Sequence, residues 1–284
     1  MSNSKIKHII MFSGGASSAY IAKWVVDKYG KESCVLLFTN TQVEDEDNYR
    51  FMEDVANYID LEITYKTDGR TPEDVFFEQK YLGNSRHAQC SHELKVKQTI
   101  LYLNELIREG FHPILYFGIS ADEKHRIDSL TFNYGHEFAL DVLDEHGEIV
   151  EMNEMGIRFP LGNMIRTTSD IHSIIEKEWS IPLPRMYKLG FKHANCAGKC
   201  VRAGMHHFAN LYRIWPDRYR EFEEMEEKFR SKFELNVSMM KRKGKPFTLR
   251  ELREDTLEKM SEEELLAYSL EEDNDYIPCS CSFS

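Results

Sequence analysis

The chain has 284 residues, of which 42% are hydrophobic and 30% are charged, and its formal net charge is −12. These values indicate a folded protein with a substantial interior, and the acidic balance argues against a general nucleic-acid coat or a binder of anionic membranes. No apolar run approaches the roughly 18 residues of a membrane span, and the first residues lack a secretory signal. We therefore expect a cytoplasmic protein with no membrane partner.

Short apolar runs alternate with amphipathic segments through the first half of the chain. The runs predict strands over residues 6–12, 34–39, 61–65 and 114–119. Helices are predicted after the first run, up to Gly30, and over residues 45–58 and 90–109. Alternation of this kind is typical of a parallel sheet with helices on its faces.

The second half of the chain changes character. Residues 132–156 form a looser segment that we interpret as an insertion or hairpin, and a capped helix is predicted over 168–177. Long charged helices follow over 205–212 and 216–233, and the basic residues 241–245 are interpreted as a solvated turn between two helices. We predict three parts: an α/β domain over 1–203, a helical subdomain over 204–270 and a flexible, cysteine-bearing tail over 271–284.

A turn of small residues, SGGASS, joins the first predicted strand to the first predicted helix. Glycines let a backbone approach an anion closely, and the N-terminus of the helix adds partial positive charge. The first loop at the carboxyl edge of a parallel sheet is also where such folds bind ligands. The turn therefore predicts a phosphate site made of Ser13, Gly14, Gly15, Ser17 and Ser18.

Several segments resemble, in order along residues 6–202, the motifs of PP-loop enzymes, and most closely the phosphoadenosine-phosphosulfate reductase branch. SGGASSA is similar to the SGGxDS signature, and residues 39–51 (TNTQVEDEDNYRF) resemble the loop and helix after that family's second strand. Residues 90–97 (CSHELKVK) resemble its Cys-Cys segment, and residues 117–126 (FGISADEKHR) resemble its glycine-rich strand end. Residues 159–164 (FPLGNM) and 181–200, which end in CAGKC, resemble its last motifs.

The resemblance implies a doubly wound, mostly parallel five-stranded sheet of the adenine nucleotide alpha hydrolase-like class, so that residues 1–203 form a nucleotide-binding domain. The implied ligand is an adenine nucleotide, either ATP or phosphoadenosine phosphosulfate, and the implied reaction is sulfonucleotide reduction with release of sulfite. Beyond the phosphate loop, the nucleotide-binding residues carried over by position are Thr39, Gly118 and Glu123.

The resemblance also implies catalytic residues and partners. Lys95 and Arg126 offset sulfate charge, and Cys279 or Cys281 of the tail attacks sulfur. A thioredoxin-like protein is the implied reductant, a homodimer is possible, and a nucleic acid enters only as a substrate for modification.

Departures from the family pattern, which include Ser91 at the second cysteine of the first pair and one extra residue within the second pair, leave two other functions open. Ser17 stands where PP-loop pyrophosphatases carry Asp, and Ser120 lies where the reductases prefer Arg. One alternative is an AMP-forming ligase that adenylates a nucleobase or another acceptor for thiolation or amidation, with Mg²⁺ held by Glu44, Asp45 or Asp122. The other is a non-catalytic nucleotide-sensing module whose charged helices form an interaction surface.

The cysteines form two groups that suggest metal or redox chemistry. Cys196 and Cys200 are spaced CxxxC, and Cys90 occupies a position that ligates an iron–sulfur cluster in some members of the resembled family. Thiolates suit a [4Fe-4S] cluster, and zinc is the second choice. A fourth ligand could come from the tail or from His193, His206 or His207. The alternative is that these cysteines are small buried residues beside a substrate pocket.

Overall fold

The computed structural model describes residues 5–84, 87–119, 127, 156–164 and 167–271. The predicted hairpin over 132–156, apart from Gly156, and the tail from residue 272 onward lie outside the described residues, as do Ser120, Asp122, Glu123, Arg126, Cys279 and Cys281.

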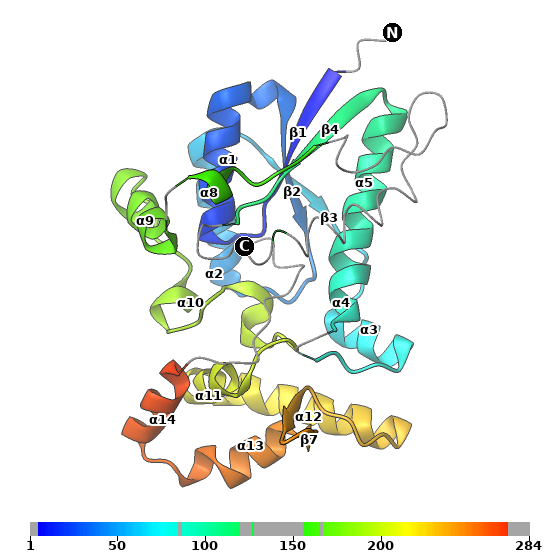
Figure 1. Cartoon of the computed structure of the whole chain (residues 1–284), viewed down its shortest axis with the longest axis vertical. Helices are drawn as coiled ribbons and strands as arrows, with labels where there is room; N and C mark the ends of the chain where they lie inside the picture. Colours follow the sequence, from blue (N-terminus) through cyan, green and yellow to red (C-terminus); the bar gives the residue numbers. More distant parts are fainter. Residues whose placement is uncertain (1–4, 85–86, 120–126, 128–155, 165–166, 272–284) are drawn as a thin grey trace.

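A five-stranded parallel sheet forms the centre of the molecule, in the order β3-β2-β1-β4-β5 (Figure 1). The strands are β1 (Lys5–Met11), β2 (Cys34–Thr39), β3 (Ile63–Lys66), β4 (Phe111–Tyr116) and β5 (Ile157–Arg158). The predicted parallel sheet is confirmed. One strand was misplaced: β4 ends at Tyr116, and the apolar residues Phe117 and Ile119 are buried in the loop that leaves the sheet.

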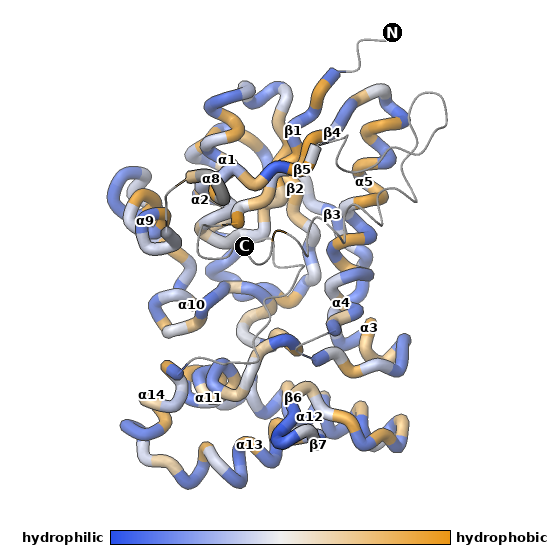
Figure 2. Tube along the Cα trace, in the orientation of Figure 1, coloured by the Kyte–Doolittle hydropathy of each residue, from blue (hydrophilic) through white to orange (hydrophobic). Residues whose placement is uncertain are grey.

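Helices cover both faces of the sheet. Along β1, Ile10 packs with helices on one face, whereas Ile9 and Met11 pack on the other, because successive residues of a strand point to opposite sides. Figure 2 shows these central strands among the most hydrophobic segments. The helices in this part are α1 (Ala16–Tyr29), α2 (Glu46–Ile59), α3 (Pro72–Gln79), α5 (Lys97–Arg108), α8 (Pro160–Asn163), α9 (Thr168–Ser173) and α10 (Arg185–Lys188), with short turns η1 (Lys31–Ser33), η4 (Ile174–Glu178) and η5 (Asn195–Gly198).

The helix predicted over 90–109 is continuous but not regular. It begins as α4 (Gln89–Ser91), continues as the π-helical turn η2 (His92–Val96) and ends as α5. Turns of this type are rare and occur frequently at functional sites. Here the turn contains Lys95, which is buried.

The C-terminal part is helical, as predicted, with a short hairpin. Its elements are α11 (Met205–Ile214), α12 (Pro216–Phe233), β6 (Met240–Arg242), β7 (Lys245–Phe247), α13 (Leu249–Asp255), η6 (Leu257–Lys259) and α14 (Glu262–Leu270). The basic residues 241–245 are exposed around the turn of this hairpin, between α12 and α13. The solvated turn is confirmed, and the two short strands beside it were missed.

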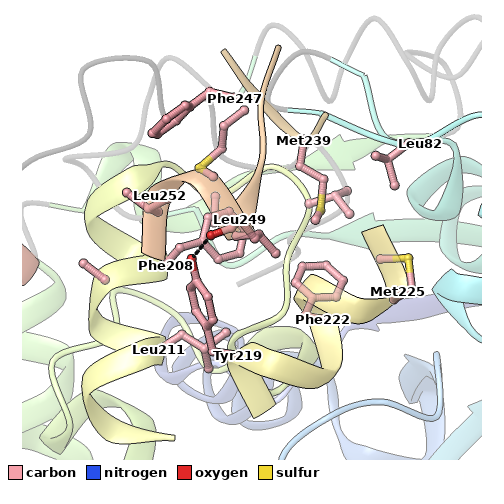
Figure 3. Packing of buried hydrophobic residues seen from close by; sticks show 14 of the residues in the cluster. Leu82, Phe208, Leu211, Tyr219, Phe222, Met225, Met239, Phe247, Leu249 and Leu252 are labelled. Atoms are coloured by element: carbon pink, nitrogen blue, oxygen red, sulfur yellow. Dashed lines mark hydrogen bonds between the residues drawn. The ribbon is translucent and has the colours of Figure 1, made fainter. Parts of the chain in front are cut away.

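The core of the helical part includes residues from the α/β part. Tyr219, Phe208 and Leu249 lie at its centre (Figure 3), and Phe76 and Ala88 belong to the same cluster. This cluster crosses the domain boundary predicted at residue 203. In Figure 1 the helices α11–α14 lie together beyond the carboxyl end of the sheet. None of the helices in the described ranges is long and apolar enough to cross a membrane.

Candidate functional site

The small-residue turn lies between β1 and α1, at the carboxyl edge of the sheet. Ser18 is fully buried, and its Oγ donates to the Gly15 carbonyl at 2.8 Å while accepting from the Ser13 amide at 3.3 Å. Gly15 is the N-cap of α1 and has no side chain to cap the helix. The N-terminal amides of a 14-residue helix therefore face this turn with their partial positive charge.

Two predicted glycines lie where a side chain would collide with neighbouring atoms. Gly14 has φ +79°, and a Cβ there would lie 2.7 Å from the side-chain amide of Asn48. A Cβ on Gly118 would lie 2.6 Å from the backbone of Ser17 and Ser18. The residues carried over from the end of β4 and from the first loop thus meet in space. Thr39, the last residue of β2, is buried at the same edge and pairs with Lys66 of β3.

Sequence reasoning missed Asn48, which lies in the first turn of α2. The residue has 0% exposure, and neither Nδ2 nor Oδ1 has a hydrogen-bond partner within the described part of the chain. A signal was present, because Asn48 lies within the quoted segment 39–51. Its burial against the loop could not be read from the sequence.

Glu44 connects the carboxyl edge of β2 to two distant segments. Its Oε1 lies 3.8 Å from Lys95 Nζ and accepts from Thr41 Oγ1 at 3.3 Å. Its Oε2 accepts from the Cys196 amide at 2.5 Å. Burial alone would lower the pKa of Lys95, but Glu44 and the neighbouring thiols hold that pKa above its usual value. Lys95 is therefore a buried ammonium balanced by one carboxylate.

The predicted cysteine cluster comes together. Cys90, Cys196 and Cys200 line one small cavity of about 30 Å³ with Ser91 and Lys95. All three are free thiols, whereas Cys34 is buried separately in β2.

The three thiols differ in acidity. A hydrogen bond from Cys196 lowers the pKa of Cys200 to about 7, against the effect of burial and with help from Lys95. The same hydrogen bond, together with burial, raises the pKa of Cys196 well above its usual value. Burial and the neighbouring Cys200 raise the pKa of Cys90 to about 12. Cys200 is therefore the thiol of this cluster best able to ionise near neutral pH.

The turn that carries Cys196 has an unusual backbone. Cys196, Ala197 and Gly198 have φ values of 55°, 48° and 85°, so three consecutive residues adopt the left-handed conformation. Such residues are costly outside glycine and cluster at functional sites. The Gly198 carbonyl is fixed by His207 Nε2 at 2.8 Å.

The donor set only partly fits a four-thiolate cluster. Within the described ranges, no group of three or more His, Cys, Asp or Glu side chains has an arrangement that could hold a metal ion. The cavity supplies three thiols, and its other lining residues with polar side chains are Thr41, Ser91, Lys95 and Lys199. His206 Nδ1 lies 2.8 Å from the Tyr268 carbonyl, and His207 contacts Gly198 as described above. The [4Fe-4S] or zinc site stays a prediction, and it would need a fourth ligand in addition to the three thiols.

Two of the acidic residues named for Mg²⁺, Glu44 and Asp45, are engaged within the protein, and Asp122 lies outside the described residues. Asp45 is 1% exposed and accepts from Arg185 at 2.8 Å and from Arg218 at 2.9 Å. Despite burial, the two guanidinium groups hold the pKa of Asp45 below its usual value. Arg218 also lies over the Trp215 ring, 4.1 Å from its centroid. Asp45 therefore anchors the helical part to α2, and the guanidinium groups of Arg185 and Arg218 offset its charge.

Comparison with protein-family models and with curated proteins found no match. The site is therefore defined by its own chemistry. It combines a turn of small residues at the N-terminus of α1 with a buried Lys–Glu pair, and three thiols line the cavity that Lys95 also lines.

Proposed function

We propose that this chain is an adenine-nucleotide-dependent enzyme of sulfur metabolism, with a PP-loop fold, that reduces a sulfonucleotide and releases sulfite. The observation that carries the proposal is the link made by Glu44 at the edge where the predicted phosphate loop lies. This one side chain contacts Lys95 and the Cys196 amide, and both residues line the thiol cavity.

The division of roles follows from the geometry. The turn over residues 13–18 and the N-terminus of α1 suit the phosphates of a nucleotide. Lys95 supplies a fixed positive charge near the thiols, which would stabilise charge that develops on a sulfuryl group. Arg126 and Glu123 keep their proposed roles by resemblance alone.

The proposed reaction uses two thiols. A thiolate attacks the sulfur of the sulfated nucleotide, the bond from sulfur to the phosphate oxygen breaks, and a cysteine S-sulfonate forms as the nucleotide leaves. A second thiol, from a thioredoxin-like dithiol protein, then attacks the cysteine sulfur, so that sulfite departs and a disulfide remains. By resemblance, Cys279 or Cys281 is the thiolate that attacks the sulfated nucleotide. Among the described residues, Cys200 is the thiol whose pKa suits the same step.

The test is a product assay on the full chain. Phosphoadenosine phosphosulfate is supplied with reduced thioredoxin and sulfite is measured, and ATP with Mg²⁺ is supplied separately while AMP and pyrophosphate are measured. We expect the wild type to release sulfite. We expect a large loss of sulfite release in Cys200→Ser and in the double variant Cys279→Ser/Cys281→Ser. Cys34→Ser is the matched control, because Cys34 lies in β2 away from the cavity.

The other products identify the alternatives. AMP and pyrophosphate from ATP without sulfite would replace the reductase with an AMP-forming ligase. If nucleotide binds but neither sulfite nor AMP with pyrophosphate forms, the result would support the non-catalytic nucleotide-sensing module.

The cluster is tested separately by iron, zinc and absorbance measurements on protein purified without oxygen. Iron that is lost in Cys196→Ser would support a [4Fe-4S] group held by Cys90, Cys196 and Cys200. Such a group would add redox capacity at the thiol cavity. A preparation free of both metals would leave the thiols to act as thiols.

A further inference from the structure

The buried amide of Asn48 lacks what buried polar groups in proteins normally have. Its side chain has 0% exposure, and neither polar atom has a partner among the described residues. An amide removed from water without a hydrogen bond destabilises the folded state, and such a group in a native protein requires an explanation.

The position of Asn48 supplies that explanation. Its amide lies against Gly14 of the phosphate loop, 2.7 Å from where a Cβ would stand. Gly14 is held in the left-handed conformation, and the helix that follows has no side-chain cap at Gly15. An unpartnered donor and acceptor therefore adjoin a helix N-terminus that favours anions.

The charges around Asn48 favour a neutral donor at this point. Glu44 and Asp45 precede it in the same segment, and both carboxylates are balanced inside the protein, by Lys95 and by two arginines respectively. The segment therefore brings no unbalanced negative charge from these two residues to the loop, and the amide adds none.

We infer that Asn48 is a ligand-contacting residue of the phosphate loop, whose Nδ2 donates to a phosphate oxygen of the bound nucleotide. Its Oδ1 is then free to accept from a hydroxyl or an N–H group in the same complex. This inference rests on the proposed function only in its premise that the loop binds a nucleotide phosphate. It adds a residue that the resemblance to the family did not supply.

The test compares stability and binding in one variant. Asn48→Leu has a similar volume and removes the buried amide. We expect the urea midpoint of the ligand-free protein to stay the same or rise, because an unsatisfied polar group is lost. We expect the Kd for ATP, measured by calorimetry, to weaken about 10-fold or more, because a hydrogen bond to a charged oxygen is lost. A purely structural role predicts the reverse: a lower midpoint and an unchanged Kd.

A second variant tests the charge. Asn48→Asp places a carboxylate where the phosphate is expected, so the Kd should weaken more than in Asn48→Leu, and the difference should shrink as salt is added. Equal ATP binding by the wild type and Asn48→Asp would overturn the inference.

Asn210→Leu is the matched control. Asn210 is also buried, but its Nδ2 donates to the Leu189 carbonyl at 2.9 Å and its Oδ1 accepts from Arg213 at 2.8 Å. The same substitution there should lower the urea midpoint and leave the Kd for ATP unchanged.

The inference and the proposed reaction fail in distinguishable ways. If the wild type binds neither ATP nor phosphoadenosine phosphosulfate, the role of Asn48 falls with the role of the loop. If it binds nucleotide in an Asn48-dependent manner but releases no sulfite, the inference stands and the proposed reaction is wrong.

Discussion

Two fully buried polar residues of the helical C-terminal part, Glu226 and Tyr219, have hydrogen-bond partners within the chain, whereas the side chain of Asn48, beside the loop over residues 13–18, has none among the described residues. Glu226 has 0% exposure, and its two oxygens accept from the amides of Met239 at 3.0 Å and Leu249 at 2.7 Å. Tyr219, also fully buried, donates to the Leu249 carbonyl at 2.7 Å, as the dashed line in Figure 3 shows.

The difference separates two uses of buried polarity. In the helical part, Glu226 and Tyr219 tie α12 to the segments that follow it, so their hydrogen bonds serve the fold. At the carboxyl edge of the sheet, the side-chain amide of Asn48 and the left-handed turn at Cys196 destabilise the folded state. For Asn48, no hydrogen bond within the described residues compensates this cost. Local features that conflict with stability are expected where a ligand or a reaction uses them.

Replacing a buried polar residue by Leu in each region tests this difference. Glu226→Leu leaves two buried backbone amides without an acceptor, so we expect it to reduce the free energy of unfolding by about 4 kcal/mol. Asn48→Leu should leave the free energy of unfolding unchanged. Urea unfolding at pH 7.5 measures both. A comparable loss in the two variants would show that Asn48 serves the fold as Glu226 does.

Glu226 also makes a pH-dependent prediction. Burial raises its pKa to about 7 from a reference of 4.5, against the two backbone amides, which lower it. Because the folded state binds this proton more tightly than the unfolded state, its contribution is fully present below about pH 4.5 and is lost as pH rises through about 7. The loss amounts to about 3 kcal/mol at most.

The measurement is a series of urea unfolding curves from pH 4.5 to 8 for the wild type and for Glu226→Gln. The difference in unfolding free energy between the two proteins should change across this window and flatten as pH approaches 8, about one unit above the pKa of Glu226 in the folded state. A difference in unfolding free energy that stays constant with pH would show that Glu226 does not titrate in this range. Other groups titrate in both proteins, so the comparison cancels them.

Much of the fold could be predicted from the sequence because it follows from local pattern. The run Cys34–Thr39 is a strand over the same residues as predicted, and α12 has the predicted bounds. The start of α2 after Asp45 follows from its cap, which accepts from the Asp47 amide at 3.1 Å. The end of β4 was misplaced because apolar residues continue beyond the sheet into a buried loop.

The candidate site was predictable in its parts but not in its connections. The glycines and serines of the first loop follow from chain chemistry, and the resemblance brought Gly118, Lys95 and the cysteines to it. The Glu44 contacts and the burial of Asn48 depend on how α2, the π-helical turn at Lys95 and the CxxxC turn pack together. Contacts between segments 34 to 152 residues apart leave no periodic signal in a single sequence.

Gly118→Ala tests whether the loop over residues 13–18 binds the nucleotide. A Cβ at this position would lie 2.6 Å from backbone atoms of Ser17 and Ser18, so one of the two loops must shift. Displacement of a preorganised anion site by a fraction of an ångström is costly, and we expect the Kd for ATP to weaken about 100-fold, equivalent to about 2.7 kcal/mol.

The matched control for this variant is Gly69→Ala. Gly69 has φ +91° and nothing within 4 Å of the added carbon, so the change introduces backbone strain without a clash. It should lower stability by about 1 kcal/mol and leave the Kd for ATP unchanged. If Gly118→Ala binds ATP as well as Gly69→Ala does, the contact between the β4 loop and residues 13–18 contributes to the fold and not to the nucleotide site.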